Sequence, residues 1–134
     1  MTDRFVVRLL RVDAAVGLLF GTVLLATPGW LLDLFGFRAD QDALVVARLY
    51  GAEVIGFSVA TVLASAGRHR GARTAVAVGH LFSEGIGAVV AAIALASGLG
   101  NALGWIIVVL LAGFAALFAY VLYAPRGVLR AGRR

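Results

Sequence analysis

Five ionisable side chains fall inside long apolar stretches of this chain: Asp13, Arg48, Glu53, His80 and Glu84. A charged side chain at the centre of a bilayer costs about 2.5–3.5 kcal/mol or more, so such residues rarely face lipid. They face the interior of a helical bundle instead, where they pair with one another. Acids and an imidazole gathered in this way can bind and release protons, which suits proton-coupled transport or the binding of a small ligand.

Helical spacing predicts that four of these residues share one interior layer. His80 and Glu84 are four residues apart and therefore lie on one face of a helix. Asp13 and Glu53 each begin a stripe of small residues, a pattern that lets neighbouring helices pack closely. We therefore expect these four residues to meet in one layer within the inner half of the membrane. Arg48, in the outer third of its span, would reach towards either glutamate.

Three other interpretations of the same residues stay open. In the first, they form a network of salt bridges and hydrogen bonds that only fixes helix register, as in an accessory subunit of a larger membrane complex. In the second, a metal ion is held by His80, Glu84, Glu53 and Asp13, although a site of this kind would have only one histidine ligand. In the third, Glu84 and His80 act as acid and base on a lipid or quinone. No motif of a known enzyme chemistry accompanies them, so we do not favour catalysis and expect no metal or other cofactor.

The composition argues against a soluble domain and against disordered, collagenous and disulfide-rich proteins. Of 134 residues, 62% are hydrophobic and only 14% are charged, whereas an ordinary soluble domain is about half apolar and about a quarter charged. Cysteine is absent, which excludes disulfide frameworks and thiol chemistry. The net charge is +5, but the basic residues lie in short clusters between apolar runs, so we expect no nucleic-acid partner.

Four stretches are long enough to cross about 30 Å of hydrocarbon, which takes about 20 apolar residues. We predict spans at about 6–27, 43–66, 72–97 and 102–123. The last two are divided by Gly98-Leu99-Gly100-Asn101, which are residues typical of a turn. A segment at about 30–37 is too short to span and would form either a short interfacial helix or an extension of the first span. The sequence thus predicts an all-α integral membrane protein, with residues 1–134 as a single domain of four transmembrane helices in a compact bundle.

The positions of the arginines predict how this bundle is oriented. With four crossings, ten of the 12 basic residues fall on one side, which should be cytoplasmic: Arg4, Arg8, Arg11, Arg68, Arg70, Arg73, Arg126, Arg130, Arg133 and Arg134. Both termini would then be cytoplasmic, and we expect a bacterial cytoplasmic (inner) membrane. Because four helices seldom enclose a pathway alone, the partners we expect are the lipid bilayer and either further copies of the chain or a larger membrane complex.

Overall fold

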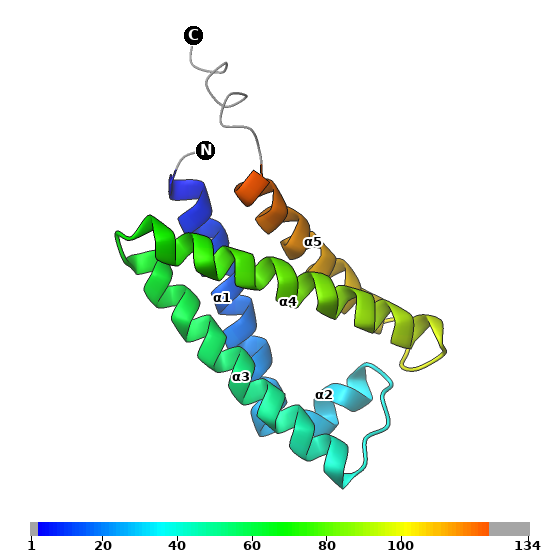
Figure 1. Cartoon of the computed structure of the whole chain (residues 1–134). Coiled ribbons are helices and arrows are strands. Elements are labelled where there is room, and N and C mark those ends of the chain that lie inside the picture. The colour runs from blue at the N-terminus through cyan, green and yellow to red at the C-terminus, as the bar shows by residue number, and fades with distance from the viewer. Residues whose placement is uncertain (1–2, 124–134) are drawn as a thin grey trace.

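The computed structural model describes residues 3–123, and within them the chain forms five helices and no strand (Figure 1). Four helices are long: α1 (Asp3–Ala26), α3 (Gln41–Ala66), α4 (Arg70–Ala96) and α5 (Gly104–Tyr123). Each of these is long and apolar enough to cross a membrane. The short α2 (Pro28–Leu34) lies between α1 and α3 as a helix of its own, because the helix of α1 ends before Thr27; of the two alternatives for this segment, the separate short helix is the one that forms. The all-helical class and the four long helices are therefore confirmed.

Local sequence signals set several helix ends. Pro28 begins α2, where its missing N–H leaves no hydrogen bond unmade. The Asp40 side chain accepts a hydrogen bond from the Ala43 N–H, with 2.9 Å between the heavy atoms, and so caps α3. After α4, Gly98 and Gly100 adopt φ values of 82° and 81°, which side chains with a Cβ rarely adopt. The turn predicted between the last two spans therefore lies where the chain reverses.

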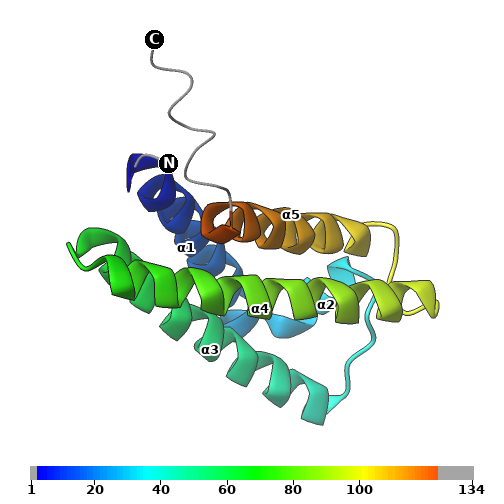
Figure 2. The same ribbon diagram turned by 45° about the horizontal axis from the view of Figure 1, so that its top comes forward.

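The four long helices associate as two pairs. α1 packs along most of α3, and α4 packs along most of α5, whereas contact between α3 and α4 is much more limited. Figures 1 and 2 show that the end of α3 and the start of α4 lie close together at their short link, and that the two helices diverge away from it. The residues that join one pair to the other consequently have a large influence on how the pairs are placed.

Glycines allow the α1–α3 pair to approach closely. A Cβ on Gly51 would lie 2.8 Å from the Leu25 backbone nitrogen and 2.9 Å from the Gly21 carbonyl oxygen. A Cβ on Gly17 would collide with the Ser58 hydroxyl. At Gly51 the two backbones are close enough that only glycine fits, whereas at Gly17 it is the Ser58 side chain that leaves no room for a Cβ.

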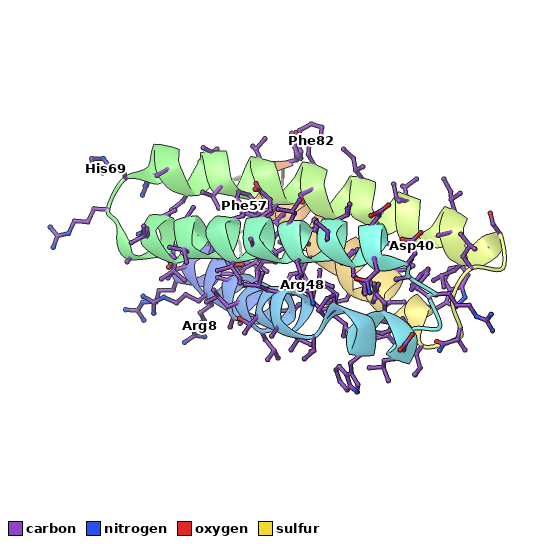
Figure 3. The ribbon with its side chains drawn as sticks, turned by 90° about the horizontal axis from the view of Figure 1, so that it is seen from below. Arg8, Asp40, Arg48, Phe57, His69 and Phe82 are labelled. Carbon is purple, nitrogen blue, oxygen red and sulfur yellow. The ribbon has the colours of Figure 1, made fainter. Side chains whose placement is uncertain are left out.

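The two ends of the bundle differ in their charges. The start of α1, the α3–α4 link and the end of α5 lie at one end, and α2 lies at the other (Figure 1). Figure 3 shows Arg8 and His69 towards the first end and Asp40 towards the second. At the second end Asn101 joins two links, since its side chain donates to the Leu34 carbonyl at 3.0 Å. The arginines at 126, 130, 133 and 134 lie outside the described residues.

Polar groups lie inside the bundle, and large apolar side chains lie outside. The buried polar residues are Asp13, Ser58, Thr61, Ser65, His80 and Glu84. Beside them, a small apolar core joins the two pairs through Leu9, Leu10, Ala77 and Phe118. Large apolar side chains are exposed on each long helix. This is the reverse of the usual distribution in a soluble domain, where charged residues are almost never fully buried unless paired.

Candidate functional site

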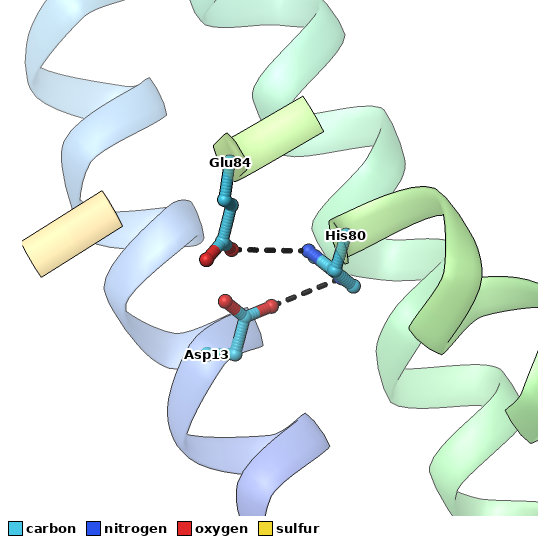
Figure 4. Close-up of side chains that lie close together, drawn as sticks. All are labelled: Asp13, His80 and Glu84. Carbon is cyan, nitrogen blue, oxygen red and sulfur yellow. Dashed lines mark ion pairs between the residues drawn. The ribbon is translucent and has the colours of Figure 1, made fainter. Parts of the chain in front are cut away.

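Three of the predicted residues meet where the two helix pairs touch. Asp13 comes from α1, and His80 and Glu84 come from neighbouring turns of α4 (Figure 4). Their exposed fractions are only 6%, 5% and 8%. We call these three residues the acid–imidazole cluster. It confirms the expectation that Asp13, His80 and Glu84 share one interior layer.

The imidazole of His80 contacts one acid with each ring nitrogen. Nε2 lies 3.0 Å from Asp13 Oδ2, and Nδ1 lies 3.3 Å from Glu84 Oε1. Thr61 Oγ1 lies 2.8 Å from the same Nε2 and donates its own proton to the Phe57 carbonyl oxygen at 2.9 Å. Thr61 therefore accepts a hydrogen bond from Nε2. With both ring nitrogens protonated, His80 donates to Asp13 and Thr61 on one side and to Glu84 on the other.

Two aromatic rings pack against the faces of the His80 imidazole. The Phe118 ring of α5 is stacked on it, with 4.9 Å between centroids and 10° between planes. The Phe57 ring of α3 is tilted by 37° at a centroid distance of 4.4 Å. Because Phe118 has no exposed surface, this side of the cluster is closed to solvent. The rings leave the imidazole edge, with its two nitrogens, directed at the acids.

The charges of the acid–imidazole cluster do not balance when both acids are ionised. Two carboxylates and one imidazolium give a net charge of −1, and one further proton on either acid makes the cluster neutral. The second carboxylate oxygen of Glu84, Oε2, is buried and has no hydrogen-bond partner within residues 3–123. An unpartnered buried oxygen of this kind is costly unless it takes up a proton or another partner. The cluster therefore has a specific atom at which a further proton can bind.

The donor set also permits a test of the metal hypothesis. One ligand atom from each of Asp13, His80 and Glu84 lies within 4.8 Å of the other two. However, Asp13 faces one ring nitrogen and Glu84 faces the other, and a metal ion binds an imidazole through a single nitrogen. A metal held by all three side chains would require one acid to leave its present nitrogen. This geometry fits protons better than a metal ion.

Two predicted members of the site lie elsewhere. Glu53 is exposed on α3, beside an open groove of about 530 Å³, so the expectation that it joins the cluster is wrong. Arg48 is exposed as well and forms no ion pair with Glu53 or Glu84 within the described chain. Thr61 is the α3 residue that reaches His80, whereas Glu53 lies about two turns further from the α3–α4 link, where the two helices have diverged (Figure 1). Figure 3 shows Phe57 between α3 and α4, and Arg48 on the other side of α3.

Sequence reasoning missed three side chains that complete the site: Phe57, Thr61 and Phe118. A usable signal for Thr61 is its spacing with Ser58 and Ser65, since three hydroxyls three and four residues apart mark one face of a helix. All three hydroxyls are buried and donate to carbonyls of their own helix. The phenylalanines carry no such signal, because aromatic residues also face lipid.

No protein-family model, curated protein or solved structure matches this chain. The chemistry of the site follows from its own residues. A buried imidazole between two carboxyl groups, closed by two aromatic rings, can take up a proton, hold it and pass it between three groups. The same contacts can also fasten α1 to α4.

Proposed function

We propose that this chain is an integral protein of a bacterial cytoplasmic membrane, with both termini on the cytoplasmic side. Three observations support the proposal. Four helices have the length and composition of membrane spans, and their outward side chains are largely apolar. The arginines of the described chain are concentrated at one end, at the start of α1 and the α3–α4 link. Short basic segments of this kind stay in the cytoplasm.

We further propose that the protein carries out proton-coupled transport of a small solute, with the acid–imidazole cluster as the proton-binding site. The observation that carries this proposal is the His80 ring, which faces Asp13 with one nitrogen and Glu84 with the other. Uptake of one proton changes the net charge of the cluster from −1 to 0. In transporters, ionisable side chains of this kind within a bundle serve as proton relays.

The location of the cluster suggests how proton binding is coupled to movement. Asp13 belongs to the α1/α3 pair, and His80 and Glu84 belong to the α4/α5 pair. A change of charge therefore acts on the contact between two pairs that share, beside the cluster, a small apolar core and limited contact between α3 and α4. Many transporters alternate between states by rocking one helical unit against another around a fixed site. Protonation of the cluster would favour one relative position of the pairs over the other.

A second role is favoured by the burial and direct pairing of the same residues. The three residues of the cluster are each more than nine-tenths buried, and His80 contacts both acids directly. Such a network could have a purely structural role, in which it fixes one arrangement of the helices. That role would suit an accessory subunit of a larger membrane complex. The two roles differ in whether Glu84 exchanges a proton during activity.

The deciding variant is Glu84→Gln, because glutamine retains the shape and hydrogen-bonding ability of the side chain but cannot bind and release a proton. Wild-type protein in lipid vesicles with a pH-sensitive dye inside would be supplied with panels of small organic cations, anions and neutral solutes. We expect proton flux with at least one solute, and its loss in Glu84→Gln. Asp33→Asn, which removes an exposed acid from α2, is the matched control and should keep the flux.

Infrared titration of the same samples gives a second readout. A carboxylic acid signal that appears and disappears with pH in the wild type, and is absent from Glu84→Gln, supports proton exchange at this residue. Full activity of a folded Glu84→Gln variant would contradict it and favour the structural role.

A further inference from the structure

One face of α3 is left uncovered by the rest of the described chain. Exposed apolar and small residues follow one another along it at alternating spacings of three and four: Val45, Leu49, Ala52, Gly56, Val59 and Leu63. This is the spacing of the a and d positions of a heptad repeat, with which two helices form a coiled coil. Because α3 packs on α1 through a different face, which contains Gly51 and Ser58, no other described helix packs on this seam.

Two opposite charges flank the seam. Arg48 directly precedes the a position Leu49, and Glu53 directly follows the d position Ala52, so they occupy the g and e positions of the repeat. Both are exposed, and neither forms an ion pair between residues 3 and 123. In a membrane-spanning helix, a charge left facing lipid is strongly unfavourable. Arg48 and Glu53 therefore each require a partner of opposite charge from outside residues 3–123.

A second copy of the chain supplies both partners at once. Two copies with the same orientation in a membrane are related by an axis along its normal, so their α3 helices run parallel. In that arrangement a g residue faces the e residue five positions later on the other helix, about 7.5 Å further along at 1.5 Å per residue. Arginine at g and glutamate at e, five residues apart, fit this requirement. We propose that α3 is the contact of a parallel homodimer, in which Arg48 of each copy pairs with Glu53 of the other.

The shape of this face of α3 fits the α3 helix of a second copy. Ala52 and Gly56 lie at the middle of the seam, where small side chains let two membrane helices approach closely. A Cβ built on Gly56 would meet nothing within 4 Å, so the space in front of it is open. The groove beside Glu53 runs along this surface and offers about 530 Å³ to side chains of the partner helix. The contact is symmetric, which is the rule for a homodimer with a two-fold axis. This inference rests on the proposed membrane insertion and not on proton exchange at the cluster.

Charge-reversal variants test the pairing between copies. Arg48→Glu places like charges at both pairs of the homodimer, and Glu53→Arg does the same with the opposite sign. We expect each variant alone to weaken self-association about tenfold or more. When the two variants are produced together with different affinity tags, positions 48 and 53 again carry opposite charges across both pairs of the mixed dimer. We therefore expect the two variants to copurify with each other from mild detergent. Restoration by the mixture also shows that both variants fold.

Cross-linking of an otherwise unchanged chain gives an independent test. The chain has no cysteine, so Leu49→Cys at the seam introduces a single thiol. We expect it to form a disulfide between copies in membranes, whereas Val109→Cys, on the exposed surface of α5, should not. The proposal would be overturned if Arg48→Glu and Glu53→Arg, each tested alone, self-associated as the wild type does. Equal cross-linking at positions 49 and 109 would also overturn it. Monomers with no cross-link at either position would mean that the seam faces lipid, and would overturn it as well.

Discussion

Phe118 of α5 lies flat on the imidazole of His80, with 4.9 Å between ring centroids and 10° between the planes. This contact gives α5, which carries no charged residue, a direct part in the acid–imidazole cluster. The ring of Phe57 lies on the imidazole as well, at 4.4 Å between centroids. Two apolar rings therefore orient the polar one and keep solvent from its faces, while hydrogen bonding takes place only at its edge.

Replacing Phe118 by alanine should destabilise the fold at this point. Phe118 is completely buried, and removal of a buried phenylalanine side chain costs about 3–5 kcal/mol. The neighbouring Leu117 is 42% exposed, so Leu117→Ala should change the free energy of unfolding by only about 0.5 kcal/mol. Denaturant unfolding of the two purified variants measures the difference. Equal losses would mean that Phe118 does not pack in the interior.

His80→Leu should destabilise the protein because it leaves two buried acids without a cation between them. Removal of one partner from a buried ion pair costs about 3–5 kcal/mol. The triple variant Asp13→Asn, His80→Leu, Glu84→Gln removes the charges as well, and we expect it to regain most of that loss. His69→Leu, at an exposed position in the α3–α4 link, is the control for the single substitution. A triple variant less stable than His80→Leu would contradict this electrostatic explanation.

The sequence was sufficient to predict the four long helices and three members of the cluster. Length and apolar composition determine the spans, and the four-residue spacing of His80 and Glu84 places them on one face whatever their neighbours are. Glu53 could not be placed in the same way, because a single helix does not reveal which of its faces meets another helix. Its stripe with Gly56 and Ala60 resembles a packing face, and in this chain that face is exposed. The hydroxyl face with Thr61 is the buried one.

Which helices pack against each other could not be predicted from the sequence either. Glycines at 17 and 21 predict that some helix approaches closely, but the sequence does not show that the partner is α3, whose Gly51 lies against Gly21. Phe57 and Phe118 could not be assigned for a similar reason, since the side chains they contact come from other helices. Long-range contacts of this kind depend on the rotation of each helix about its axis.

Gly51→Ala should separate α1 from α3. The added Cβ would lie 2.8 Å from the Leu25 backbone nitrogen, and backbone cannot move aside as a flexible side chain can. Overpacking of this kind costs about 1–3 kcal/mol. At Gly113 a Cβ meets nothing within 4 Å, so Gly113→Ala should be neutral or slightly stabilising. Thermal unfolding of both variants in one detergent provides the comparison, and a Gly51→Ala protein as stable as the wild type would show that the helices are further apart.

The two ends of the bundle should lie on opposite sides of the membrane. Gln41 begins α3 near the acidic end, and Gly71 lies in the first turn of α4 at the arginine-rich end; both are exposed. Because the chain has no cysteine, Gln41→Cys and Gly71→Cys each introduce one site for a maleimide that cannot cross membranes. With arginines held in the cytoplasm, intact cells should be labelled at position 41, and position 71 should react only after permeabilisation. The reverse pattern would invert the orientation while leaving the bundle unchanged. Labelling of both positions in intact cells would instead show that the chain does not cross the membrane between them.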